Sequence, residues 1–260
     1  MQKKMIFFDI DGTLVNGQNE VPESTKQALI ELEKNGHEIA IATGRNLSLA
    51  QPVIDLLGFK NYVICNGAAG YYHHERVCHH PIDKASLLKL LATADELGHQ
   101  MIVESDALLR RRDEEYAPIV EEALATVGAT PPPVDKAFHL NHEVVQCLHF
   151  YPEADQHHYE DDGQFPLLKF VRWHPGSVDV LPHGGSKAKT IMELTEKLGI
   201  QPENIYAFGD GLNDVEMLSQ VHHSVAMGNA TDEVKKHAKH VTTSVDEDGI
   251  FLALKKLNLI

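Results

Sequence analysis

Short polar segments follow two apolar runs, and together they carry groups that could do chemistry. Asp9 and Asp11 follow the first run, and Asp210 and Asp214 follow the second. Carboxylates gathered in one place would repel one another, and a hard divalent cation such as Mg²⁺ removes this conflict because it prefers oxygen ligands. These acids are therefore candidate metal ligands.

A second set of side chains offers groups that hold phosphate oxygens. Thr43 supplies a hydroxyl, Asn213 an amide and Lys187 an ammonium, and each stands at or near the end of a predicted strand or the start of a helix. Such donors stabilise the charge on a transferring phosphoryl group. Together with a metal and a nucleophile they predict phosphoryl transfer.

The first two aspartates can take different roles. Asp9 ends the apolar run and would be held rigidly beside the metal, so it is the expected nucleophile, forming an aspartyl-phosphate. Asp11 lies two residues further on, on the same side if the strand continues. It could protonate the leaving alcohol and then take a proton from the attacking water. This second role favours hydrolysis over storage of the phosphoryl group.

The elements that position these residues alternate between strands and helices. The unbroken apolar run at 5–8 predicts a strand buried on both faces of a parallel sheet. Further strands are expected at 39–42, 62–65, 205–208 and 224–227, with amphipathic helices between them. This pattern predicts an α/β fold with a doubly wound parallel sheet, in which ligands bind at the carboxyl edge.

The rhythm changes between about residues 82 and 183. Segments 167–173 and 177–181 predict a hairpin that turns at Pro175-Gly176, and helices accompany it. We therefore expect residues 1–81 and 184–260 to form a catalytic core of Rossmann-like topology. Residues 82–183 are expected to form an inserted α+β cap domain.

Composition narrows the possible partners and the compartment. The chain has 260 residues with a formal net charge of −15, which excludes a general affinity for nucleic acid or an anionic membrane surface. The three cysteines form no zinc-type pair, so a reducing compartment is expected. Without a recognisable leader or membrane span, we expect a cytoplasmic protein, monomeric or homodimeric, that acts on a small phosphate ester.

Four motifs resemble those of the haloacid dehalogenase (HAD) superfamily of phosphatases, specifically its Cof-like branch. They appear in the family's order across almost the whole chain. The motifs are Asp9-Ile10-Asp11-Gly12-Thr13, Thr43-Gly44-Arg45, Lys187 within 185–188, and the run 209–214 with Asp210, Asn213 and Asp214.

The resemblance implies roles for individual residues. It implies that Asp9 and Asp210 ligate Mg²⁺ by their side chains and that Asp11 does so by its backbone carbonyl, with support from Asp214. It also implies a phosphate-binding set, which comprises Thr43, Gly44, Lys187 and Asn213. Phosphorylated sugars and related metabolites are the substrates that the resemblance suggests, with specificity set by the cap.

Other polar residues have weaker signals. Asn66 could touch substrate or simply form an Asn-Gly turn. Arg45 could contact substrate, although a structural ion pair beside the site is favoured. The paired histidines lack metal-ligand spacing and are expected on the solvated surface. The run 110–112 predicts an exposed turn, or alternatively an arginine that reaches a second anionic group of the substrate.

A Mg²⁺-dependent phosphatase is the leading interpretation, and two alternatives stay open. A phosphosugar mutase would use the same aspartate, and the outcome depends on whether water or a sugar hydroxyl reaches the intermediate. A non-catalytic metabolite-binding regulator is the other alternative, although binding alone requires neither a nucleophile nor an acid. A dehalogenase is disfavoured because it needs neither Asp11 nor Asp210.

Overall fold

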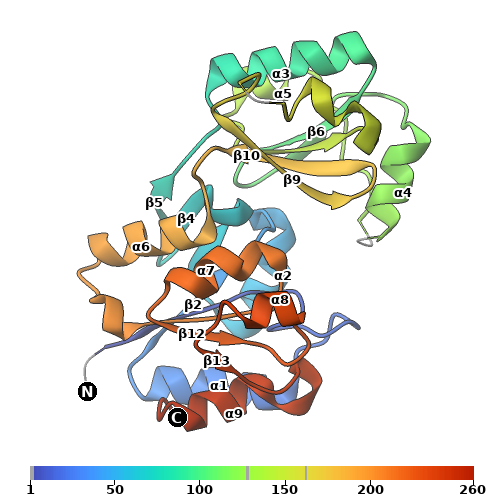
Figure 1. Ribbon diagram of the computed structural model, residues 1–260. Coiled ribbons are helices and arrows are strands. Elements are labelled where there is room, and N and C mark those ends of the chain that lie inside the picture. Colours follow the sequence, from blue (N-terminus) through green and yellow to red (C-terminus); the bar gives the residue numbers. More distant parts are fainter. Residues whose placement is uncertain (1–2, 127–128, 162) are drawn as a thin grey trace. The chain divides into compact units, whose positions relative to one another are not determined.

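The chain divides into two compact units. A computed structural model describes residues 3–126, 129–161 and 163–260 (Figure 1). The first unit comprises Met1–His79 and Ser186–Ile260, and the second comprises His80–Gly185. The sequence places the two junctions after residues 81 and 183, and each lies two residues from the junction in the structure, after His79 and after Gly185. The roles of the units as catalytic core and cap stay predictions.

The described part of the first unit contains an eight-stranded sheet with β1 near its middle. The strand order is β13-β12-β11-β1-β2-β3-β4-β5. The strands are β1 (Met5–Phe8), β2 (Glu38–Ala42), β3 (Asn61–Ile64), β4 (Ala69–Tyr72), β5 (Glu75–His79), β11 (Ile205–Gly209), β12 (His223–Ala226) and β13 (His240–Val241). Every residue of β1 is fully buried, and the strand pairs in parallel with β11 and β2. An unbroken apolar run is what such a position requires.

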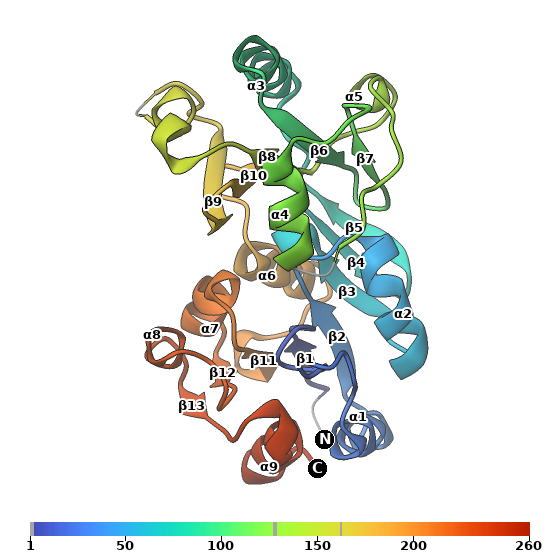
Figure 2. The same cartoon turned by 90° about the vertical axis from the view of Figure 1, so that its right-hand side faces the viewer.

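Helices cover both faces of this sheet. They are α1 (Glu23–Lys34), α2 (Leu47–Leu57), α6 (Lys187–Lys197), α7 (Val215–Gln220), α8 (Asp232–Lys235) and α9 (Gly249–Lys256). Helices α6 and α7 pack on the face that carries Met5 and Phe7. On the other face Phe8 stacks on Phe208, and α1 and α9 lie side by side (Figure 2). The doubly wound α/β fold predicted from the sequence is therefore confirmed.

Strands β4 and β5 form an antiparallel extension that the sequence did not reveal. Their turn contains His73 and His74, both with positive φ angles of 49° and 66°. Hairpin turns of this kind usually carry asparagine or glycine, which tolerate this backbone region. The usual sequence signal for a hairpin is therefore missing here.

The described part of the second unit contains a five-stranded antiparallel sheet in the order β7-β6-β8-β10-β9. Its elements are β6 (Gln100–Glu104), β7 (Leu109–Arg111), β8 (Gln146–Phe150), β9 (Leu168–His174), β10 (Ser177–Pro182), α3 (Lys84–Leu97), α4 (Pro118–Thr126) and α5 (Phe138–Asn141). The predicted hairpin is confirmed as β9 and β10. Helix α3 packs on one face and α4 on the other (Figure 2). None of the helices described here has the length and apolar character of a membrane span.

The arginine run does not form the exposed turn that was expected. Arg111 ends β7, and its guanidinium lies 4.5 Å from the ring centre of Tyr116. Arg112 is only 8% exposed and makes two hydrogen bonds of 2.8 Å to the carboxylate of Asp95. Arginine can occupy such positions because its long apolar stem packs while its charge is paired. The exposed-turn interpretation is therefore wrong.

His149 is a buried titratable group in the second unit. Its ring is fully buried, 4.6 Å from that of Tyr151 and 4.3 Å from that of Tyr159 between ring centres. Neither ring nitrogen has a hydrogen-bond partner within the described residues. Burial, reinforced by the charges of His99 and Arg172, lowers the pKa of His149 well below its ordinary value. The folded protein therefore holds this ring neutral.

Replacing His149 by leucine is expected to reduce the sensitivity of the fold to acid. The unfolded chain protonates this histidine below about pH 6.5, whereas the folded chain does not. Stability is thus fully present above that pH and falls as the pH is lowered, by about 1.4 kcal/mol per pH unit for one such group. Thermal unfolding between about pH 8 and pH 5 should show a shallower loss for His149→Leu than for the wild type. The exposed His142→Leu should keep the wild-type slope, and equal slopes for all three proteins would contradict the prediction.

Candidate active site

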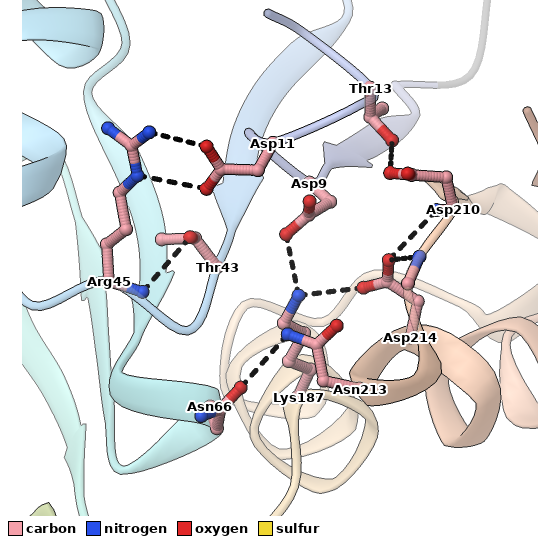
Figure 3. A network of polar contacts seen from close by, with 11 residues as sticks. Asp9, Asp11, Thr13, Thr43, Arg45, Asn66, Lys187, Asp210, Asn213 and Asp214 are labelled. Atoms are coloured by element: carbon pink, nitrogen blue, oxygen red, sulfur yellow. Dashed lines mark hydrogen bonds and ion pairs between the residues drawn. The ribbon is translucent and has the colours of Figure 1, made fainter. Parts of the chain in front are cut away.

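The predicted polar segments meet at the carboxyl edge of the first unit's sheet. Asp9 directly follows β1, Thr43 follows β2, and Asp210 follows β11. These three strands are adjacent and parallel, so their carboxyl ends lie at the same edge. Figure 3 shows their side chains together with those of Lys187 and Asp214.

Lys187 lies between two carboxylates in the interior of this edge. Its Nζ donates hydrogen bonds of 2.7 Å to Asp9 Oδ1 and 2.7 Å to Asp214 Oδ1. The three residues are 1%, 5% and 0% exposed, respectively. Burial by itself would lower the pKa of Lys187, but the charges of Asp214 and Asp9 outweigh it and raise the pKa above its ordinary value. The lysine is therefore a permanent cation of the site.

The start of α6 is fitted tightly against the turn that follows β3. Gly67 has a φ of +99°, and a Cβ added there would stand 2.2 Å from the carbonyl oxygen of Ser186. Thr190 Oγ1 also donates to the carbonyl oxygen of Gly67 at 2.5 Å. Only glycine permits both the backbone angle and the close approach. This fit directs Lys187, the first residue of α6, toward Asp9.

Asp214 fixes the turn that carries Asp210. Its Oδ2 accepts from the backbone N–H groups of Asp210 at 3.0 Å and Gly211 at 2.9 Å, while its Oδ1 faces Lys187. A Cβ at Gly209 would lie 2.6 Å from the Asp214 carboxylate, so no larger residue fits there. Asp214 thus connects the turn after β11 to the buried lysine.

The carboxylates form a group that suits a divalent cation. One oxygen each of Asp9, Asp210 and Asp214 lies within 4.8 Å of the others. Among the described residues, these three side chains form the cluster that could hold a metal ion. Burial raises the pKa of Asp9 to about 8, against the opposing charge of Lys187. Burial also raises the pKa of Asp210 to about 6, and Asp214 adds to this shift. The single ammonium of Lys187 cannot balance three carboxylates. Mg²⁺ prefers carboxylate oxygen and fits the need for a further positive charge.

Asp11 turns toward Arg45 (Figure 3). Its two oxygens accept from Arg45 Nη2 at 2.5 Å and Arg45 Nε at 3.0 Å. Strand β1 ends at Phe8, so the continued strand that would have placed Asp11 on the same side as Asp9 is not formed. The side chain of Asp11 is 58% exposed and accordingly accessible to solvent. Arg45 makes the ion pair that was favoured over a substrate contact.

The other predicted phosphate and substrate residues also meet here. Asn213 Nδ2 donates to Asn66 Oδ1 at 3.2 Å, and a Cβ at Gly44 would lie 2.9 Å from the same oxygen. Thr43 is buried, and its hydroxyl accepts from the backbone N–H of Arg45 at 3.1 Å. Asn66 has a φ of 51°, which asparagine tolerates. The structure therefore places these residues at one edge, while their contacts with ligands stay predictions.

Two residues beside Asp210 were not assigned a role from the sequence. Thr13 Oγ1 donates to Asp210 Oδ1 at 2.8 Å, and Asn229 Nδ2 donates to Asp210 Oδ2 at 3.1 Å. Thr13 belongs to the first motif, and Asn229 follows β12 just as the other site residues follow their strands. The position of Asn229 shortly after a predicted strand could have indicated a site residue. It could not have indicated that Asp210 is its partner.

Fold and site together define the class of this protein as an α/β enzyme of phosphoryl transfer. Residues 6–254 match the family of haloacid dehalogenase-like hydrolases. Over 260 residues the chain is 38% identical to the "Putative phosphatase YkrA" of Bacillus subtilis (strain 168), with 100% of both chains covered.

Solved structures show the same similarity. A hypothetical protein from Geobacillus kaustophilus HTA426 has a TM-score of 0.94 and 39% identity, with 100% of both chains covered. The HAD subclass IIB sugar phosphatase BT4131 has a TM-score of 0.83 and 31% identity, covering 99% of this chain and 100% of that one. The chain therefore belongs to the haloacid dehalogenase-like hydrolases and is a phosphoric monoester hydrolase of that superfamily.

Proposed function

We propose that this enzyme is a Mg²⁺-dependent phosphatase of small phosphorylated metabolites, with sugar phosphates as the leading substrate class, and that it acts through an aspartyl-phosphate on Asp9. The observation that carries the proposal is the buried contact of Asp9 with Lys187, beside the carboxylates of Asp210 and Asp214. A nucleophile, a fixed cation and a set of oxygen ligands are what this reaction requires. The naming of BT4131 as a sugar phosphatase supports the substrate class.

In the first half-reaction, Asp9 attacks the phosphorus of the ester. A bond forms between an Asp9 carboxylate oxygen and phosphorus while the bond from phosphorus to the leaving oxygen breaks. Asp11 donates a proton to that leaving oxygen, which departs as an alcohol. Lys187 keeps a positive charge next to Asp9 during this step. When bound to Asp9, Asp210 and the Asp11 carbonyl, Mg²⁺ would neutralise the remaining negative charge and keep Asp9 ionised.

In the second half-reaction, water attacks the phosphorus of the aspartyl-phosphate. Asp11, now ionised, takes the proton from this water. The bond from phosphorus to Asp9 breaks, which releases inorganic phosphate and restores the carboxylate. We assign the binding of phosphate oxygens to Lys187 and to the hydroxyl, amide and backbone groups of Thr43, Asn213 and Gly44.

We assign recognition of the leaving group to the second unit. The roles proposed above for the first unit are to hold the metal, to bind the phosphoryl group and to transfer the proton. Selection among phosphate esters then requires other side chains, and the inserted unit of residues 80–185 supplies a separate sheet and helices for this purpose.

Hydrolysis of a panel of phosphate esters tests the proposed function. The purified full chain is given p-nitrophenyl phosphate, sugar phosphates and other phosphorylated metabolites, with Mg²⁺ or with EDTA. We expect release of inorganic phosphate only with Mg²⁺, and fastest release among sugar phosphates. No release from any ester would favour a metabolite-binding regulator. Isomerised sugar phosphate formed with a bisphosphate activator, in place of free phosphate, would favour a mutase.

Replacing Arg45 by alanine is expected to lower kcat about tenfold, because Asp11 would lose the two donors that hold its carboxylate. Arg45→Lys should recover only part of the rate, since a lysine keeps the charge but not the planar fork of two donors. Steady-state kinetics with p-nitrophenyl phosphate provides the measurement. A wild-type kcat for Arg45→Ala would show that Asp11 needs no such partner.

A further inference from the structure

Asn229 makes three side-chain hydrogen bonds although it is exposed. Its Nδ2 donates to the carbonyl oxygen of Gly12 at 2.9 Å and to Asp210 Oδ2 at 3.1 Å. Its Oδ1 accepts from the backbone N–H of Val245 at 3.0 Å. Both amide hydrogens and the amide oxygen thus have partners.

These partners permit only one orientation of the amide. Gly12 and Asp210 present acceptors, whereas Val245 presents a donor. A flipped amide would place oxygen against oxygen on one side and N–H against N–H on the other. The donors of Asn229 are therefore held toward Asp210 and the loop that follows β1.

The contacts of Asn229 connect segments that are distant in the sequence. Gly12 lies in the loop with Asp9 and Asp11, and a Cβ added to it would stand 2.1 Å from Asp210 Oδ2. The segment that carries Asn229 is itself fixed beside β11, because the Met227 N–H donates to the carbonyl oxygen of Gly209 at 3.0 Å. Asn229 thus joins the Asp9 loop to the carboxylate of Asp210.

Asp210 has a donor on each of its oxygens. Thr13, which is fully buried, donates to Oδ1, and Asn229 donates to Oδ2. Each carboxylate oxygen has two lone pairs, so these bonds leave one on each oxygen for a cation. They also fix the direction in which that lone pair points, which is how partners of a ligand tune a metal site.

We infer that Asn229 is a positioning residue that sets the cation affinity of the site by holding Asp210 at a fixed distance from the Asp9 loop. The inference rests on the proposed role of Asp210 as a metal ligand. A residue that merely ties loops together would change stability, whereas a positioning residue changes cation binding. Cation binding can be measured without substrate and without turnover.

The test compares wild type, Asn229→Ala and a matched control, Asn35→Ala. Asn35 is also exposed and donates one long-range hydrogen bond, to the carbonyl oxygen of Leu259 at 2.8 Å, away from Asp210. Binding of Mn²⁺ is followed by electron paramagnetic resonance and binding of Mg²⁺ by calorimetry, both without substrate. Thermal unfolding in EDTA reports the stability of each metal-free variant. Thr13→Val, which removes the other donor to Asp210, is measured alongside.

We expect Asn229→Ala to raise the Kd for both cations about tenfold and Thr13→Val to weaken binding in the same direction, with Asn35→Ala unchanged. A Kd for Asn229→Ala within about twofold of wild type would overturn the inference. Absence of cation binding by the wild type would overturn it as well, while the ester panel would still decide the function. Weakened binding by Asn229→Ala in a protein that hydrolyses no ester would support the inference and reject the proposed function.

Discussion

Replacing Lys187 by methionine is expected to lower the free energy of unfolding by about 3–5 kcal/mol, because it leaves the fully buried Asp214 carboxylate, and any charge on Asp9, without a cation. Asp9 and Asp214 are 5% and 0% exposed, so water cannot take over the role of the lysine. Turnover should be lost too, since the proposed transfer needs a positive charge beside the nucleophile. Urea unfolding in EDTA near neutral pH measures the first effect, and phosphate release measures the second.

The exposed Lys189, on the same helix, provides the control for this change. Lys189→Met should stay close to the wild type in both stability and activity. Equal unfolding free energies for Lys187→Met and Lys189→Met would contradict the expectation that the buried carboxylate depends on the Lys187 charge.

Replacing Asp9 by asparagine is expected to reduce turnover at least about a thousandfold without lowering the stability of the metal-free protein. An amide cannot form the acyl phosphate, so activity is lost. Stability should not fall, because burial raises the pKa of Asp9 to about 8. A carboxyl group with a raised folded-state pKa makes the fold less stable as the pH rises from the unfolded pKa toward that value. A neutral amide removes this loss.

Phosphate release with Mg²⁺ measures the loss of turnover. Thermal unfolding in EDTA at about pH 7 measures the stability of the metal-free protein. Asp55→Asn, an exposed change on α2, should leave both unchanged. Retention of a tenth of the wild-type rate by Asp9→Asn would contradict a nucleophilic role for Asp9. A lower unfolding midpoint for Asp9→Asn than for Asp55→Asn would contradict the physical reason given for its stability.

Much of the first unit follows from local sequence features. The apolar run at 5–8 has no polar alternation, which is typical of a strand covered on both faces, and β1 is fully buried. Asp9, Thr43 and Asp210 follow their strands directly, so the prediction of a parallel sheet was enough to bring them to one edge. These relations depend on neighbours in the chain, and the sequence shows such neighbours.

Other features depend on partners that are far apart in the sequence. Asn229 and Gly12 are separated by 217 positions, and no local pattern links them. Strand β1 ends at Phe8, before Asp11, and the Asp11 carboxylate pairs with Arg45, which is 34 positions away. The charge of Arg112 suggests exposure, but its side chain is buried and its guanidinium pairs with the exposed carboxylate of Asp95, 17 positions away. In each case a specific tertiary contact decided the outcome.

The most direct measurement of the central claim is the chemical state of Asp9 during turnover. Wild-type enzyme hydrolysing p-nitrophenyl phosphate with Mg²⁺ is quenched in acid and reduced with borohydride, which converts an aspartyl-phosphate to homoserine, and its peptides are sequenced by mass spectrometry. We predict homoserine at position 9, and none there in enzyme quenched before substrate is added. Active hydrolysis with aspartate unchanged at position 9, or with the modification at another carboxylate, would contradict the proposed nucleophile.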